Sequence, residues 1–134
     1  MKQRNVFLFL ISIFATFCTN AYEFKGTHYT AQMYGCDHTA VSKWIYVYSY
    51  FVRGCDASGA TVIRAIPHVF ENGSVTAVAL LSESHASIHT YPEFDCVFVD
   101  LFTCGDDCDY REFEKIIVEW LKPTKVRRRV WVRK

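Results

Sequence analysis

The sequence predicts an α+β domain, a two-layer sandwich in which a mostly antiparallel sheet carries two helices on one face. Its 134 residues fit a single domain of ordinary size. Hydrophobic residues make up 51% of the chain and charged residues 22%, which is enough apolar material for a packed core. Runs of consecutive strand-like segments are interrupted by only two segments with helical spacing, and that order is typical of an α+β fold.

Residues 1–22 are set apart from the rest by their composition. Lys2 and Arg4 precede an apolar run, Val6–Phe17, and small polar residues follow it, which is the layout of a secretory signal peptide. The run is shorter than the about 20 apolar residues that a membrane-spanning helix needs. A signal peptide is the first interpretation, and a membrane anchor or a plain extension stays open. The folded domain is then expected over 23–134.

The first half of that domain is expected to begin with a strand and continue into a helix. Phe24–Tyr34 mixes β-branched, aromatic and polar residues, as strands do. Asp37 or Thr39 can cap the free N–H groups of a following helix, and apolar residues recur after them at helical spacing. We therefore expect an amphipathic helix that ends near Gly54.

Three further strands are expected in the middle of the chain. The turn residues before Ala60–Val69 predict a strand there, and Asn72-Gly73 is a strong hairpin signal that leads into Val75–Leu81. Cys96–Thr103 is the next apolar segment of strand length. These segments form the central part of the predicted sheet.

The last helix and strand carry clear boundary signals. Asp109 and Glu112 stand at the spacing of a capping box, and Pro123 ends the helix that follows. Lys125–Trp131 is expected to be an edge strand whose arginines lie on its solvent side, where charge prevents edge-to-edge pairing.

The charge balance is local rather than global. The formal net charge is only +1, although six of the 15 basic residues lie in the last ten positions. A protein without an overall positive field is a poor candidate for nucleic-acid binding, so no nucleic-acid partner is expected.

The cysteines and histidines do not indicate a metal site. The six cysteines are spaced irregularly and are expected to be mostly small buried hydrophobic residues. Cys104 and Cys108 lack the second pair of a structural zinc site. His85 and His89 would lie about 13 Å apart along one strand, too far to share an ion. No metal is predicted.

The segment 82–90 is the most polar stretch between the predicted strands, with seven polar residues in nine. Ala86 and Ile88 alternate with polar residues, which favours a strand with one chemically rich face over a loop. In an unbroken strand Ser84 and His89 would lie on opposite faces. They can therefore cooperate directly only if the backbone turns or is cut near Ser84.

Three interpretations of this segment remain open from the residues alone. A serine and a histidine can form an activated nucleophile, although no Gly-x-Ser-x-Gly motif surrounds either candidate serine. A metal site is disfavoured by spacing. A single histidine usually has a purely structural role. Six polar, chemically capable side chains in eight positions argue against that role for this segment.

Two long motifs stand out: Ser-Glu-Ser-His-x-Ser-Ile-His-Thr-Tyr-Pro-Glu at 82–93 and Val-Asp-Leu-Phe-Thr-Cys-Gly at 99–105. In these motifs the sequence resembles the prokaryotic S-adenosylmethionine decarboxylase proenzymes, a pyruvoyl-dependent family. Shorter matches accompany them: Gly26-x-His28, Tyr34-x-Cys36-Asp37, Ser58-Gly59-Ala60-Thr61 and His68-x-Phe70. The similarity runs without gaps from about Gly26 to the last helix.

The resemblance implies that the chain cuts itself between Glu83 and Ser84. The Ser84 hydroxyl would attack the Glu83 carbonyl, and elimination followed by hydrolysis would convert Ser84 to a pyruvoyl group. The domain would then consist of two chains, 23–83 and 84–134. The pyruvoyl cofactor would form a Schiff base with the substrate and accept the electrons left behind when carbon dioxide departs.

The resemblance also implies a role for several other residues. His89 would be the acid/base of self-processing, and Cys104 would donate a proton to the decarboxylated product. Thr76 stands where relatives have a serine that assists processing; it keeps the hydroxyl and adds a branch, so maturation is expected to be slower.

Substrate binding would fall to Phe70, Tyr91 and Glu93. The two rings would stack on the adenine and the carboxylate would accept hydrogen bonds from the ribose. The alternative is that Tyr91-Pro92-Glu93 is only a turn and Phe70 only a core residue.

The resemblance therefore predicts a carboxy-lyase that decarboxylates S-adenosylmethionine for spermidine and polyamine biosynthesis, as a homodimer with shared active sites. Such an enzyme belongs in the cytoplasm, whereas a signal-like segment would lead to export or membrane attachment. Two alternatives follow: the same scaffold acting on arginine or ornithine, or a binding homologue that no longer processes itself. Intact Glu83, Ser84, His89 and Cys104 argue against the second.

Overall fold

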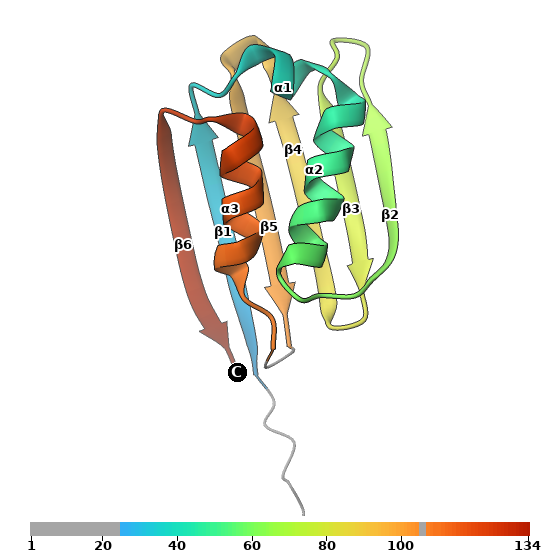
Figure 1. Ribbon diagram of the computed structural model, residues 1–134, viewed down its shortest axis with the longest axis vertical. Coiled ribbons are helices and arrows are strands. Elements are labelled where there is room, and N and C mark those ends of the chain that lie inside the picture. The colour runs from blue at the N-terminus through green and yellow to red at the C-terminus, as the bar shows by residue number, and fades with distance from the viewer. Residues whose placement is uncertain (1–24, 105–106) are drawn as a thin grey trace, which may run out of the picture.

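The computed structural model describes residues 25–104 and 107–134. These residues form one six-stranded sheet with helices on a single face (Figure 1). The strands are β1 (Gly26–Tyr34), β2 (Val62–Val69), β3 (Val75–Leu81), β4 (Ser84–Tyr91), β5 (Cys96–Thr103) and β6 (Lys125–Arg133). The helices are α1 (His38–Ser42), α2 (Trp44–Ala57) and α3 (Tyr110–Leu121), with a 3-10 turn, η1 (Pro92–Phe94).

The strand order is β2-β3-β4-β5-β1-β6, and all five neighbouring pairs are antiparallel. The two-layer α+β prediction is therefore confirmed. Strands β3 and β5 have the predicted bounds, and the polar segment that follows β3 is strand β4. The predicted signal-like segment, 1–22, lies outside the described residues. Among the described helices, none is both long and apolar enough to span a bilayer.

One predicted helix is two in the structure. Asp37 caps α1 as expected, because its side chain accepts a hydrogen bond from the Ala40 amide at 2.9 Å. The Ser42 hydroxyl then donates to the His38 carbonyl at 2.6 Å, and Lys43 takes an extended conformation before α2 begins. This local bonding competes with the helical ladder and breaks the helix near its start.

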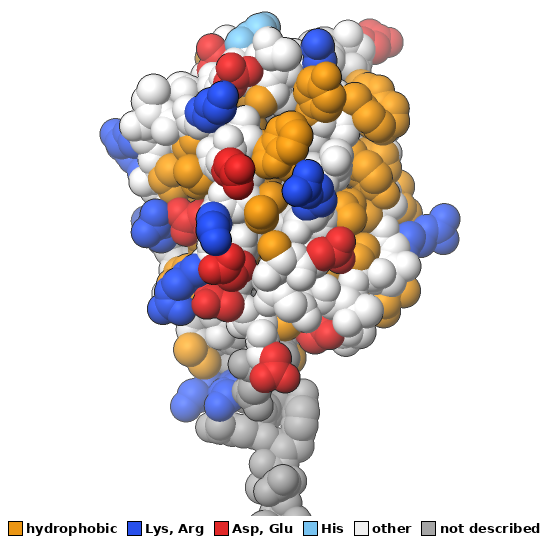
Figure 2. All heavy atoms as spheres, in the orientation of Figure 1, with side chains coloured by type: hydrophobic (Ala, Val, Ile, Leu, Met, Phe, Trp, Pro, Cys, Tyr) orange, Lys and Arg blue, Asp and Glu red, His pale blue; other side chains and the backbone are white. Residues whose placement is uncertain are grey.

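The core lies between the helices and one face of the sheet. Tyr29 and Met33 of β1 point into it, and so do Phe51 of α2 and Phe113 of α3. Helices α2 and α3 pack closely at Gly54, where an added Cβ would lie 3.1 Å from the Phe113 ring. The helical face seen from outside carries charged side chains among scattered hydrophobic ones (Figure 2).

The other face of the sheet, called here the outer face, carries no helix in the part of the chain that the structure describes (Figure 1). Alternation along each strand places its polar and functional side chains there, as the β4 burial pattern shows. The outward side chains of β4 are those of His85, Ser87, His89 and Tyr91. The outer face, which is open in the single chain, therefore carries the predicted site residues Thr76, His89 and Tyr91, whereas Ser84 is in register with the buried Thr103.

Strand β6 is at the edge of the sheet, as predicted, but its arginines do not all lie on one side. Arg127 and Arg129 pair with outward residues of β1, whereas Arg128 points to the helical face. There its guanidinium contacts the Glu114 carboxylate of α3 at 2.6 Å, and Glu114 is only 9% exposed. Three consecutive arginines on a strand must alternate in direction, so the prediction of one solvent-facing set was wrong for Arg128.

The start of α3 shows half of the predicted capping box. The Asp109 side chain accepts a hydrogen bond from the Arg111 amide at 2.8 Å. The Glu112 carboxylate instead contacts the Lys115 ammonium at 3.3 Å. The helix ends at Leu121, with Lys122 in the left-handed conformation, just before Pro123.

Candidate active site

The peptide bond between Glu83 and Ser84 lies where β4 begins beside the end of β5. Ser84 pairs with Thr103 across the two strands. The backbone N–H of Cys104 donates a hydrogen bond to the Glu83 carbonyl oxygen at 3.0 Å. That N–H polarises the carbonyl and would stabilise negative charge on its oxygen, which is the requirement for nucleophilic attack at the carbonyl carbon.

The Glu83 side chain is held by Thr61, the residue just before β2. Its Oε2 accepts a hydrogen bond from the Thr61 amide at 2.9 Å. Hydrogen bonds from the Ser82 side chain, first, and then from the Thr61 amide hold the pKa of Glu83 below its ordinary value. The carboxylate is therefore ionised and anchored immediately before the candidate cleavage point.

The Ser84 hydroxyl is hydrogen-bonded to a histidine that the sequence had not singled out for it. Ser84 Oγ lies 3.0 Å from His85 Nδ1, and the His85 ring packs against Phe102 at 5.6 Å between centroids. Neighbouring strand residues normally point to opposite faces, so strand alternation gave no signal for this contact. At Ser84, the first residue of β4, φ is +158° rather than the about −140° of a regular antiparallel strand, so the alternation does not hold there.

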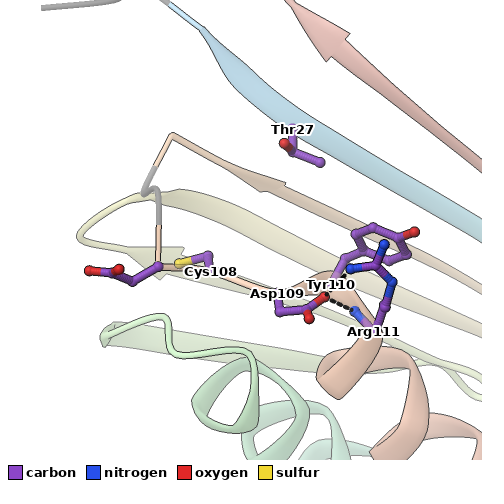
Figure 3. Close-up of a pocket in the computed structure, with 6 residues that line it drawn as sticks. Thr27, Cys108, Asp109, Tyr110 and Arg111 are labelled. Atoms are coloured by element: carbon purple, nitrogen blue, oxygen red, sulfur yellow. Dashed lines mark hydrogen bonds and ion pairs between the residues drawn. The ribbon is translucent and has the colours of Figure 1, made fainter.

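Two cysteines lie at the same end of the sheet. Cys104 follows β5 and its side chain is exposed, whereas Cys108 is half-buried. Burial, first, and then the Glu83 carboxylate raise the pKa of the Cys108 thiol. Cys108 also lines a pocket between the start of α3 and Thr27 of β1 (Figure 3). Cys36, Cys55 and Cys96 are buried, as predicted for most of the cysteines.

A second group of predicted site residues lies at the other end of β4. Thr76 of β3 pairs with His89 across the strands, and Thr76 Oγ1 is 2.5 Å from His89 Nδ1. This contact fixes the orientation of the imidazole ring. Thr76 and His89, to which the resemblance assigns separate roles in processing, are therefore in contact, which the sequence did not predict.

Aromatic rings surround His89. The ring of Tyr91 lies 4.5 Å from it and the ring of Phe70 lies 5.9 Å from it, centroid to centroid. Phe98 of β5 lies 5.3 Å from Tyr91 and extends the cluster. Phe70 is 41% exposed and is not a core residue. Glu93 is in η1, two residues after Tyr91, with its side chain exposed.

The structure does not bring the two groups together within one chain. Ser84 is the first residue of β4 and His89 the sixth, so they lie about 17 Å apart at about 3.4 Å per residue of strand. Cys104 is at the Ser84 end, and Thr76 is at the His89 end. Each end of β4 therefore carries only part of the predicted set of catalytic and processing residues.

A third polar group lies between the two ends on the outer face. Ser87 donates to the Asp100 carboxylate at 3.1 Å, and His28 Nε2 lies 3.7 Å from the other oxygen of that carboxylate. Burial lowers the pKa of His28, with Asp100 opposing the shift. The sequence gave no signal for this group because its members come from three strands that are distant in sequence.

The described residues contain no group of three or more His, Cys, Asp or Glu side chains placed to hold a metal ion.

A model of the family described as S-adenosylmethionine decarboxylase matches residues 27–134, most of the chain. The chain belongs to the S-adenosylmethionine decarboxylase family. It is 42% identical over 81 residues to the S-adenosylmethionine decarboxylase proenzyme of Prochlorococcus marinus, an alignment that covers 60% of this chain and 65% of that protein, just under two thirds. It is 38% identical over 101 residues to the corresponding proenzyme of Methanococcus maripaludis, covering 75% of this chain and 83% of that protein.

The fold agrees with this membership. The crystal structure of adenosylmethionine decarboxylase from Aquifex aeolicus superposes with a TM-score of 0.73 at 29% identity, covering 79% of this chain and 88% of that one. The matched relatives of the S-adenosylmethionine decarboxylase family carry that substrate in their names, which does not favour the arginine or ornithine alternative.

Proposed function

We propose that this chain is a self-processing, pyruvoyl-dependent decarboxylase of S-adenosylmethionine that serves polyamine biosynthesis. Two observations support the proposal. The chain belongs to a family whose matched relatives are named proenzymes, and a proenzyme is a precursor that must be processed before it acts. The Glu83–Ser84 peptide bond has a hydrogen bond on its carbonyl oxygen and a histidine on its serine hydroxyl.

Self-processing begins with attack of Ser84 Oγ on the Glu83 carbonyl carbon. The serine proton passes to a base, the C–N bond breaks, and the amide becomes an ester with a free amine on Ser84. Removal of the Ser84 Cα proton then expels the Glu83 carboxylate and leaves dehydroalanine. Water converts the dehydroalanine to a pyruvoyl group and releases ammonia. The products are chains of 83 and 51 residues before any removal of the amino-terminal segment.

The observation that carries this proposal is the hydrogen bond from the Cys104 amide to the Glu83 carbonyl oxygen. When the serine attacks, negative charge develops on that oxygen, and a donor already in place stabilises it. His85 lies in hydrogen-bond contact with the attacking hydroxyl, so its imidazole can take the serine proton. Self-cleavage thus has an oxyanion donor and a base at the correct bond.

The surroundings of Ser84 fit a pyruvoyl group. Ser84 opens a strand, so cleavage before it frees one end of β4 without breaking the rest of the sheet. A pyruvoyl ketone supplies an electron sink for the loss of carbon dioxide from an α-amino acid. We assign delivery of a proton to the product to the exposed thiol of Cys104, which is next in sequence to Thr103, the strand partner of Ser84.

Substrate recognition is assigned to the other end of the strand. The rings of Phe70 and Tyr91 both lie against His89, and aromatic rings can stack on an adenine. The exposed carboxylate of Glu93 is available to accept hydrogen bonds from the ribose hydroxyls.

The two ends require a second copy of the chain to meet. His89 lies about 17 Å from Ser84 along its own strand, so it cannot act on that residue without a large rearrangement. A two-fold axis that runs across the strands, between two outer faces, would place the His89 end of one copy over the Ser84 end of the other. A homodimer of this kind completes two sites at once.

The outer face is suited to such packing. Ile66, Val78 and Leu80 form an exposed apolar area on β2 and β3, each at least half exposed in the single chain. Sheets that pack face to face bury apolar side chains of this kind. The area lies beside β4, so burying it between two copies would hold the His89 end of one copy over the Ser84 end of the other.

Mass spectrometry and a decarboxylation assay test the proposed function. The wild-type chain is expected to yield two fragments and to release carbon dioxide from S-adenosylmethionine, but not from arginine or ornithine. A chain that stays intact and folded would identify a binding homologue. A cleaved chain that prefers arginine or ornithine would overturn the substrate assignment.

We further propose a cytoplasmic site of action, because the substrate is made there. Deleting residues 2–22 is expected to leave cleavage and activity unchanged. Recovery of the full-length protein outside the cytoplasm, or loss of activity in the shortened chain, would contradict this.

A further inference from the structure

The outer face of the edge strand β6 is positively charged. The carboxylate in register with Arg129 on this face is Asp100 of β5, which lies beyond β1 and contacts Ser87 and His28. Lys125, Arg127, Arg129 and Arg133 all point outward, as their register with β1 shows. The outward residues of β1 opposite them include no carboxylate. Within residues 25–104 and 107–134, no acidic side chain forms an ion pair with Arg127 or Arg129.

A pocket lies over this part of the strand pair. It is lined by Thr30, Gln32, Arg127, Arg128, Arg129 and Trp131. Its volume is about 320 Å³. That is roughly ten times the share of liquid volume of one water, about 30 Å³, so a small polyatomic anion can enter. Cross-strand pairing fixes the floor, with Gln32 beside Arg127 and Thr30 beside Arg129.

The groups that line the pocket are arranged as donors. Tyr34 donates its hydroxyl hydrogen to Gln32 Oε1 at 2.8 Å, which uses the amide oxygen and leaves the Gln32 NH₂ free to donate. Arg127 lies over the Tyr34 ring at 5.8 Å, so both side chains are held in place. The guanidinium of Arg129 and the hydroxyl of Thr30 complete a set that suits an oxyanion.

We propose that this pocket binds the phosphate group of a small ligand. Guanidinium groups bind phosphate through paired hydrogen bonds, and two of them with an amide and a hydroxyl match a tetrahedral oxyanion. Trp131 forms one wall, with its ring 4.6 Å from His28 and 43% of its surface exposed. That exposed ring offers a stacking surface to a phosphate ester that carries a base, such as a nucleoside monophosphate.

In the proposed dimer a bound anion would have a second role. This second role rests on the proposed function, whereas binding of the anion to the pocket does not. A two-fold axis across the strands places β6 of one copy opposite β6 of the other, so two rows of cations face each other. Like charges at such a boundary repel, and a bound dianion in each pocket would offset the repulsion. Phosphate is therefore expected to favour the dimer more than chloride does at equal ionic strength.

Isothermal titration calorimetry with inorganic phosphate, at constant ionic strength, tests the pocket. We expect saturable binding with one site per chain, weakened by about tenfold or more in R129Q and in R127Q because each loses a charged hydrogen-bond donor. The matched control is K115Q, which removes an exposed cation of α3 that forms an ion pair with Glu112 at 3.3 Å and does not line the pocket. It is expected to bind phosphate as the wild type does.

A second titration with adenosine monophosphate distinguishes the source of the phosphate. Tighter binding than inorganic phosphate, lost in W131A, would identify an ester with a flat ring; equal binding would identify the free ion. The absence of saturable binding, or equal weakening in K115Q and R129Q, would overturn the proposal. Using uncleaved S84A protein as well keeps the result independent of self-processing, and calorimetry counts sites per chain whether or not the dimer forms.

Discussion

Cys104 and Glu83, 21 positions apart, are joined by a hydrogen bond from the Cys104 amide to the Glu83 carbonyl oxygen at 3.0 Å. The bond exists because β4 and β5 are antiparallel neighbours, so the residue before β4 meets the residue after β5. It places the residue whose thiol is assigned to proton donation directly against the bond assigned to cleavage. Processing and catalysis therefore share one end of the sheet.

His85 is expected to accelerate self-processing by taking the Ser84 proton. In H85A, cleavage should be slower by about 100-fold, the lower range for loss of a general base. H85Q serves as the matched variant, because glutamine can still form a hydrogen bond to Ser84 but cannot take its proton. Cleavage is monitored over time by electrophoresis. Equal slowing in both variants supports the role of His85 as a base. Full recovery in H85Q would show that His85 only positions the hydroxyl.

Thr76 is expected to act through His89, whose Nδ1 it contacts at 2.5 Å. Replacing it in T76A removes the hydrogen bond that orients the ring. The rate of cleavage should then fall about fivefold to tenfold, as expected for a loss of about 1 kcal/mol. T76S keeps the hydroxyl and should cleave at least as fast as the wild type. If T76A and the wild type cleave at the same rate, the contact has no part in processing.

Mixing two inactive chains tests whether each active site is shared between copies. S84A lacks one end of the site and H89A lacks the other, so a mixed dimer has one complete site and one doubly defective site. When the two chains are mixed in equal amounts and pair at random, about a quarter of all active sites should carry neither substitution. The control mixture, S84A with C104A, carries both defects at the same end and should recover nothing. Recovery in neither mixture would contradict the shared site.

The cysteines should differ in their reaction with iodoacetamide in the native protein. Burial raises the pKa of Cys36 and of Cys55 to about 12, so both stay protonated and unreactive at mildly alkaline pH. Cys104 is exposed and should react first, with Cys108 slower because its pKa is also raised. Peptide mapping of the labelled protein checks the order. Labelling of Cys55 as fast as Cys104 would contradict the packing.

The same two thiols make stability depend on pH. They ionise near pH 9 when the chain is unfolded and near 12 when it is folded. Their contribution is complete below about pH 9 and is lost as the pH rises toward about 12, because the unfolded state then releases protons first. Urea unfolding across this range should show the decline, and C55A should show less of it. An equal decline in C55A would assign it to other groups.

The sequence predicted the elements well where one periodicity dominated. Strands β3 and β5 are continuous apolar or alternating runs between turn signals, and their bounds were correct. The break at Lys43 was missed because it arises from a side-chain hydrogen bond of Ser42 that competes with the helix. The direction of Arg128 was predicted wrongly because all the arginines were assigned to one side of the strand. Strand alternation turns Arg128 to the helical face, where it contacts Glu114 of α3.

The individual residues of the candidate site were predicted from the sequence, but their positions relative to one another in space were not. Motifs identified Ser84, His89 and Cys104, and those assignments remain predictions. The separation of Ser84 from His89 follows from the unbroken β4, and the contacts of Glu83 follow from pairing between strands that are distant in sequence. Such long-range contacts depend on register, which no local pattern specifies.

The most direct test is the intact mass of purified wild-type protein after prolonged incubation, with S84A as the control. We predict two chains separated by a cut between Glu83 and Ser84, the shorter one with 51 residues and a blocked pyruvoyl terminus, whereas S84A stays whole. A wild-type protein that remains a single folded chain, or that is cut at another bond, would contradict the assignment.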